Sequence, residues 1–175
     1  MKNLAIVWLC LGLLGIAPAL ANAPLPPPQG PVLLRISGEI AKSNSEGEAH
    51  FDRQMLQALP QHQRCTTTPW TDGRIRYQGP LIRDLLAWVG APIDGSMLAT
   101  ALDGFRAEIT LSDLVHHDVM LAIQQEGQPL AMRDLGPLFV LYPFDEKPEL
   151  LNERIRFRSV WHLANLHIHA LEGRQ

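Results

Sequence analysis

Glycine and proline interrupt this chain so often that long secondary-structure elements are excluded. The 175 residues include 13 glycines and 14 prolines, and proline both lacks an amide donor and restricts the residue before it. Apolar residues recur at helical spacing in 51–59 and in 81–89, where Pro80 precedes the pattern and Gly90 follows it. The dipeptide Asp103-Gly104 predicts a hairpin. Runs of strand length occur at residues 32–36, 98–102, 105–109, 119–124, 138–142 and 160–170. We therefore expect a single compact α+β domain with a mixed sheet and short helices.

The first residues have the features of an export signal. Lys2 supplies a positive charge, residues 4–16 form an apolar run that is short for a membrane span, and Ala19-Leu20-Ala21 is a small-x-small cleavage site. We expect a signal peptide over residues 1–21, export by the general secretory route and a periplasmic location. A proline-rich leader at 22–31, extended and mobile, would then precede the domain at 32–170.

Cysteine content and charge limit the remaining possibilities. Cys10 lies in the apolar run and is removed with the signal, so Cys65 is the one cysteine left. An internal disulfide is therefore impossible, and the domain must be stabilised by its hydrophobic core. The formal net charge of -3, without a basic stripe, argues against nucleic acid as a partner. No long apolar run follows the signal, so we expect no direct membrane insertion after cleavage.

The stretch from Cys65 to Gly73 concentrates polar side chains next to a tryptophan. A strand that ends in Thr68-Pro69 stops pairing, which would leave the threonine hydroxyls free to line a pocket. The alternative is an ordinary strand exit whose threonines are satisfied by the backbone. His167 and His169 share one face of the last expected strand, but without an evident third ligand they predict no metal site.

The order of several short motifs resembles a known family. These motifs are 77–81 (Tyr-Gln-Gly-Pro-Leu), 101–105 (Ala-Leu-Asp-Gly-Phe), 122–130, Gly136-Pro137-Leu138 and Val160-Trp161. Over about residues 32–168 the chain is similar to the sulfite-oxidase fold of the molybdopterin-binding oxidoreductases. The resemblance implies an α+β domain with a pterin pocket formed by loops.

The chain also departs from the catalytic members of that family. They hold molybdenum through a cysteine in a Cys-Ala-Gly-Asn-like turn, to which Cys65 alone could correspond, and they carry an arginine where this chain has Phe139. The motifs Thr68-Pro69-Trp70, 133–137 and Tyr142-Pro143 more closely resemble those of small periplasmic PruR-like regulators. That resemblance implies a reduced pterin bound without metal and action on a membrane-bound cyclic-di-GMP enzyme. Molybdenum cofactor insertion in the cytoplasm would require a twin-arginine signal, whereas this chain begins Met1-Lys2-Asn3.

A pterin is a flat ring with a donor and acceptor edge, so its site needs apolar faces and a few placed polar groups. We expect Trp70 and Tyr142 to supply the apolar faces. The hydrogen-bonding edge of the ring would contact Thr66, Thr68 and Asp72, and Arg133 would contact the side chain of the pterin. Alternatively, Trp70 is a core residue and Tyr142 an ordinary strand residue, while Arg133 supports its loop through Asp134 or is a surface charge.

Two other functions remain open. One is a molybdopterin-dependent oxidoreductase with Cys65 as the molybdenum ligand, and the other is a redox sensor that uses the Cys65 thiol. For a regulator, the partner would be the exported domain of a membrane signalling protein. We expect the turn at 144–148, which carries mixed charges, to contribute to that contact.

Overall fold

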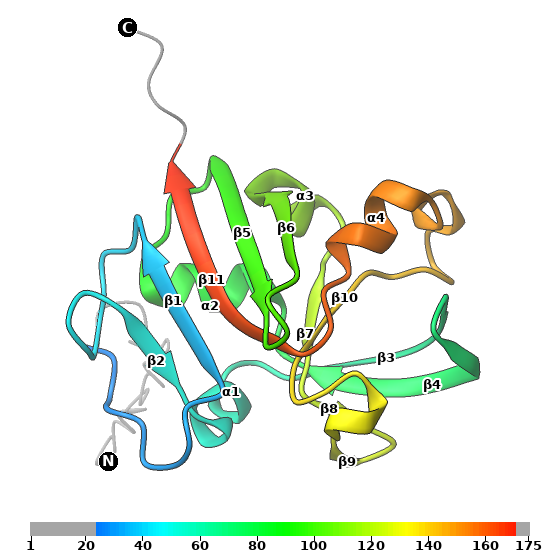
Figure 1. Ribbon diagram of the computed structural model, residues 1–175, viewed down its shortest axis with the longest axis horizontal. Helices are drawn as coiled ribbons and strands as arrows, with labels where there is room; N and C mark the ends of the chain where they lie inside the picture. Colours follow the sequence, from blue (N-terminus) through cyan, green and yellow to red (C-terminus); the bar gives the residue numbers. More distant parts are fainter. Residues whose placement is uncertain (1–23, 171–175) are drawn as a thin grey trace, which may run out of the picture.

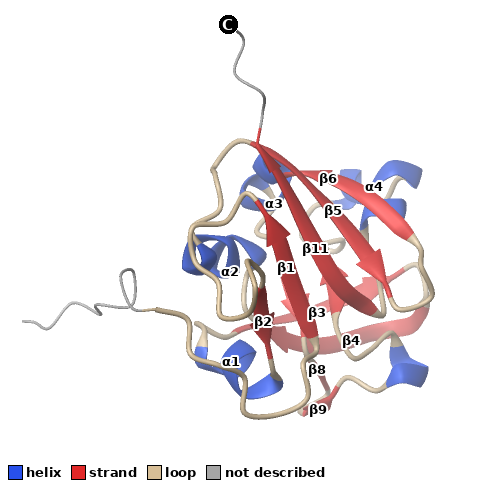
Figure 2. Cartoon of the chain, turned by 60° about the vertical axis from the view of Figure 1, so that its left-hand side comes forward, coloured by secondary structure: helices blue, strands red, loops and turns tan. Residues whose placement is uncertain are grey.

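A computed structural model describes residues 24–170 of the chain. Its largest sheet has five strands in the order β2-β1-β11-β5-β6 (Figures 1 and 2). The central strand β11 pairs in parallel with β1 and antiparallel with β5. The strand bounds are β1 Leu34–Gly38, β2 Ala49–Phe51, β5 Gly95–Ala101, β6 Arg106–Thr110 and β11 Leu163–Ala170. The first expected strand and the last are therefore confirmed, and they lie side by side.

The remaining strands form a second layer beside this sheet. Four of them make a sheet in the order β3-β4-β8-β9, and β7 pairs with β10. Their bounds are β3 His62–Thr68, β4 Thr71–Gly79, β7 Met120–Ala122, β8 Gln124–Gln125, β9 Gln128–Pro129 and β10 Phe139–Leu141. In Figure 1 the β3–β4 hairpin extends to the lower right, beyond the edge of the five-stranded sheet. The expected α+β class with mixed strand pairing is confirmed.

The helices are short, as the glycine and proline content predicts. Helix α1 spans Arg53–Ala58 and begins at Asp52, whose side chain accepts a hydrogen bond from the amide of Met55. Helix α2 spans Ile82–Val89, lies behind the five-stranded sheet in Figure 1, and ends at Gly90 with φ of 68°. Beyond them lie α3 Leu111–His116, η2 Met132–Asp134, η3 Pro148–Leu150 and α4 Glu153–Arg158. None of the helices in residues 24–170 is long and apolar enough to cross a membrane.

The proline-rich leader is attached to the domain in its described part. Leu25 is buried in the core, and the Asp52 carboxylate accepts hydrogen bonds from the amides of Gln29 and Gly30 at 2.6 and 2.8 Å. Burial alone would raise the pKa of Asp52, but these amides and that of Met55 hold it below its ordinary value. The leader is extended but anchored, which corrects the expectation that it is mobile. The expected signal peptide lies outside the described residues.

Two segments fold differently from the sequence prediction. Pairing does not stop at Thr68, because Thr68 pairs with Thr71 across a turn at Pro69 and Trp70, and the stretch 62–79 is one long hairpin. Proline is tolerated there because the turn needs no ladder amide. The hairpin expected between residues 119–124 and the segment after Gly127 forms only near its turn, where Gln124 pairs with Pro129 and the amide of Leu130 donates to the carbonyl of Ile123. Instead β7 pairs with β10, and only the two-residue strands β8 and β9 flank the turn at Glu126-Gly127.

Candidate functional site

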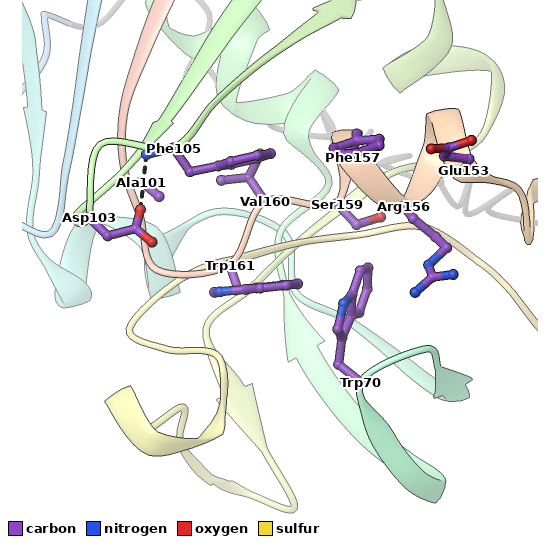
Figure 3. Close-up of a pocket in the computed structure, with 10 residues that line it drawn as sticks. All are labelled: Trp70, Ala101, Asp103, Phe105, Glu153, Arg156, Phe157, Ser159, Val160 and Trp161. Carbon is purple, nitrogen blue, oxygen red and sulfur yellow. Dashed lines mark hydrogen bonds between the residues drawn. The ribbon is translucent and has the colours of Figure 1, made fainter.

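A cavity of about 500 Å³ lies where three separate parts of the chain meet. These parts are the tip of the β3–β4 hairpin, the turn between β5 and β6, and α4 with the segment that leads into β11 (Figure 3). Its size falls in the range of small-molecule sites. The lining residues are Trp70, Ala101, Asp103, Phe105, Glu153, Arg156, Phe157, Ser159, Val160 and Trp161.

Four aromatic rings line the cavity: Trp70, Phe105, Phe157 and Trp161. The rings of Phe105 and Phe157 lie 6.5 Å apart and within 17° of parallel. Figure 3 shows them along one side of the cavity and Trp161 along the opposite side, all drawn nearly edge-on. Trp70 stands across this arrangement, 4.9 Å from Trp161 and at 71° to it. The cavity therefore offers apolar faces to a flat ring from two sides.

Trp70 is held in place by the core and by the hairpin turn. Its ring also packs in edge-on geometry against Phe139 and Phe144, with ring centroids 5.9 and 6.4 Å apart. Its amide donates to the Thr68 hydroxyl at 3.3 Å. The ring is half-buried, so one part packs on the core while another part lines the cavity.

The charged groups of the lining lie apart from one another. In Figure 3 the Asp103 carboxylate is on the far side of Trp161 from Arg156, whose guanidinium points toward Trp70. The side chain of Arg156 makes no ion pair or hydrogen bond within residues 24–170. Glu153, in the first turn of α4, directs its carboxylate away from Trp70. The cavity thus combines aromatic walls with one acidic group, Asp103, on one side of Trp161 and, on α4, both Glu153 and Arg156, of which Arg156 points toward Trp70.

Helix α4, which supplies one wall of the cavity, is held through Arg158 by a polar cluster around Asp113 that does not line the cavity. The carboxylate oxygen Oδ2 of Asp113 accepts hydrogen bonds from the Tyr142 hydroxyl at 3.1 Å and from Arg158 at 3.0 Å. His117 lies 3.5 Å from the other oxygen of Asp113. Burial, followed by the nearby Asp113 charge, raises the pKa of Tyr142 far above its ordinary value. Tyr142 is therefore a neutral donor that supports α4.

Known proteins share this fold. The model of the oxidoreductase molybdopterin-binding domain family matches residues 33–144, which is more than half of the chain. The chain belongs to this family. The structure is similar to sulfane dehydrogenase SoxCD from Paracoccus pantotrophus, with a TM-score of 0.57 and 20% identity over 81% of this chain. The chain spans 39% of that SoxCD chain. No curated protein sequence matches it.

In this member of the family the hydroxyls of Thr66 and Thr68 are hydrogen-bonded within the hairpin and to the neighbouring loop at 144–148. Thr66 is buried, donates to the carbonyl of Thr67 at 3.1 Å and accepts from the amide of Asp145 at 3.1 Å. Thr68 is also buried and shares a 2.7 Å hydrogen bond with the Thr71 hydroxyl. Neither threonine lines the cavity.

The other residues expected in the site are dispersed. Asp72 is exposed at the start of β4, and Arg133 has a side chain that is 88% exposed and 3.4 Å from Asp134. Tyr142 is fully buried, with its hydroxyl on Asp113. Of the six expected binding residues, Trp70 is the one that lines the cavity.

Cys65 lies away from the cavity. Its side chain is exposed on β3, and it is absent from the lining, which contains no cysteine or histidine. Within residues 24–170 no group of three or more histidine, cysteine or acidic side chains is placed to hold a metal ion. His167 and His169 do approach each other, with ring centroids 4.5 Å apart, and the Ser37 hydroxyl is 2.8 Å from Nδ1 of His167.

Several lining residues were not among the sequence candidates. Trp161 and Phe105 belong to motifs that carry the family resemblance, so their position in those motifs was the available signal. Arg156 and Phe157 lie in a charged six-residue helix without apolar periodicity. Exposed aromatic residues such as Phe157, which is 57% exposed, identify a site only once the fold brings them together.

Proposed function

We propose that this protein is an exported sensory protein that binds a reduced pterin without metal in the aromatic cavity. The observation that carries the proposal is the set of four rings around a cavity of about 500 Å³. A pterin is flat and polarisable, so it gains from burial between aromatic faces. Family membership supports a pterin in particular, because molybdopterin is itself a pterin.

The residues present fit the organic part of molybdopterin but not its metal. In the catalytic members that this chain resembles, molybdenum is held by a cysteine thiolate. Here the one available thiol, Cys65, is exposed and does not line the cavity. We therefore assign no reaction step to a molybdenum centre. The chain's own residues bind and orient the ring, and they exclude water from its faces.

The rival function is a periplasmic molybdopterin-dependent oxidoreductase with Cys65 as metal ligand, and family membership is the observation that favours it. Metal analysis of protein purified from its native compartment separates the two functions. We expect less than stoichiometric molybdenum, together with a reduced pterin that is released on denaturation. Stoichiometric molybdenum that is lost in Cys65→Ser would establish the enzyme instead.

The regulatory output extends the proposal. Resemblance to PruR-like regulators supports a periplasmic protein that acts on a membrane-bound cyclic-di-GMP enzyme through that enzyme's exported domain. Linkage requires that pterin change partner affinity by the same factor as the partner changes pterin affinity. Capture of the tagged protein on native membranes, with and without tetrahydropterin, tests this output. Capture that is insensitive to pterin would refute it.

The loop at 144–148, which was expected to contact the partner, is also bonded to the β3–β4 hairpin. Asp145 accepts hydrogen bonds from the amide and hydroxyl of Thr67 and lies 3.2 Å from Arg74. Glu146 accepts from Arg64 at 3.0 Å. Both acids therefore hold the β3–β4 hairpin, and reversing their charge would alter the cavity wall as well as any partner contact. Glu149, which follows this loop, is exposed and has an electrostatic influence on His117, but its side chain makes no hydrogen bond or ion pair within residues 24–170, so Glu149→Lys is the cleaner probe of this surface.

A further inference from the structure

Besides Glu153, which points away from Trp70, the cavity carries two charged groups of opposite sign, and they differ in the interactions that they already make. Asp103 lies at the β5–β6 turn and Arg156 on α4, on opposite sides of the aromatic rings (Figure 3). An elongated flat ligand would meet both groups at once. These charged groups can therefore distinguish the two ends of the ligand, which the aromatic faces cannot do.

Asp103 is fixed with acceptor capacity to spare. Its Oδ1 accepts a hydrogen bond from the amide of Phe105 at 3.0 Å, which sets the carboxylate against the turn. Its Oδ2 receives no hydrogen bond from residues 24–170. A carboxylate offers about four lone-pair sites, so it can still accept a pair of neighbouring N–H donors.

Arg156 is the free guanidinium of α4 that faces the cavity. Arg158, two residues later, is already held by Asp113 at 3.0 Å. Arg156 has no such partner in the described part of the chain, and Figure 3 shows it directed toward Trp70. Since a guanidinium donates but cannot accept, this end of the cavity selects oxygen-bearing groups and favours anionic ones.

Resting on the pterin-binding function proposed above, we propose that these two charges fix the direction of the bound pterin. The Asp103 carboxylate accepts from the 2-amino group and the adjacent ring N–H of the pyrimidine edge. The Arg156 guanidinium donates to oxygens of the substituent at the opposite end, and it favours a carboxylate or a phosphate ester over a neutral hydroxyl. The ligand class is a pterin with an acidic or oxygen-rich side chain.

The test uses calorimetric titration of the full mature chain with four reduced probes. Three are pterins that carry a 6-hydroxymethyl group, its phosphate ester or a 6-carboxylate. The fourth is 6-hydroxymethyllumazine, in which a carbonyl replaces the 2-amino donor. Charge-assisted hydrogen bonds contribute enough that we expect the wild type to prefer pterin over lumazine, and the acidic side chains over the neutral one, by roughly tenfold to a hundredfold.

Conservative variants assign each preference to its residue. Asp103→Asn keeps an acceptor for the Phe105 amide and should lose the preference for pterin over lumazine. Arg156→Gln should lose the preference for the acidic side chains while keeping the pyrimidine preference. Arg154→Gln on the same helix and Asp72→Asn on the hairpin do not line the cavity, so both should match the wild type. Preference for the phosphate or for the carboxylate identifies which anion the site reads.

The outcomes separate the two proposals. Loss of one preference in each cavity variant, with normal controls, supports the orientation. If the wild type binds pterins but both variants keep both preferences, the orientation is wrong while the pterin function stands. If no probe binds the wild type, the pterin function fails and the orientation fails with it.

Discussion

Trp70 gives the sharpest separation between a structural role and a binding role. Its ring makes three contacts in edge-on geometry, with Phe139, Phe144 and Trp161. Each such pair contributes about 0.5–1.5 kcal/mol beyond the area it buries, so Trp70→Ala should lower the free energy of unfolding by about 2–4 kcal/mol. The same change removes one wall of the cavity. Loss of a buried aromatic anchor weakens binding by about 1–3 kcal/mol, or roughly fivefold to more than a hundredfold.

Trp88 supplies the matched control. It is half-buried on α2 and contacts Phe51 at 5.5 Å, away from the cavity. Trp88→Ala should therefore destabilise the fold while leaving the dissociation constant for 6-hydroxymethyl-tetrahydropterin unchanged. Urea unfolding gives the stability of each variant, and calorimetry at a temperature where both remain folded gives the affinity. An unchanged affinity in folded Trp70→Ala would remove Trp70 from the site and refute the stacking argument.

Three further predictions concern Cys65, Asp145 and Tyr142. Cys65→Ser should leave pterin affinity, measured by calorimetry, within roughly threefold of wild type, which corresponds to about 0.7 kcal/mol. The reason is that the thiol is exposed and does not line the cavity. A larger loss of affinity would show that Cys65 contributes to the binding site. Hydrogen bonds from Thr67 lower the pKa of Asp145, so Asp145→Ala should cost about 1–2 kcal/mol at neutral pH. Because the pKa of Asp145 is lower in the folded state, the stability difference between wild type and Asp145→Ala should persist at pH values above the ordinary aspartate pKa of about 3.9. It should vanish as the pH falls through the folded-state pKa. A stability difference in urea unfolding that does not depend on pH would contradict this prediction. Tyr142→Phe should cost about 1 kcal/mol in thermal unfolding, since the Asp113 carboxylate loses a donor, and should leave pterin affinity unchanged; weaker binding without destabilisation would indicate ligand contact.

Local signals predicted α1, α2 and one hairpin because each signal acts within a few residues, whereas α4 has no such signal. Pro80 and Gly90 bracket α2 as expected, and Asp103-Gly104 lies at the turn between β5 and β6. The β3–β4 hairpin was missed because Pro69 was interpreted as the end of pairing. In the structure this proline occupies the turn, where no ladder hydrogen bond is needed.

The site was harder to predict than the fold because its parts are distant in sequence. Trp70 was proposed because it directly follows a polar turn, and the fold places it in the cavity lining. For Tyr142 the sequence left a binding role and an ordinary strand residue open, and only the fold shows that its buried hydroxyl has Asp113 as a partner. Arg156 could not be identified from local sequence, because only the fold shows that Arg158 is paired with Asp113 while the Arg156 side chain has no such partner within residues 24–170.

The position of β11 constrains when this protein can fold. This strand lies between β1 and β5, so the middle of the five-stranded sheet is supplied by residues 163–170, which come after every other strand. Until they emerge, β1 and β5 have no shared neighbour and the sheet remains split. Contacts of such large sequence separation form slowly because a long loop must close first. A chain threaded through a membrane from its N-terminus could therefore not complete this sheet until residues 163–170 had crossed, which makes late folding a property of the topology itself.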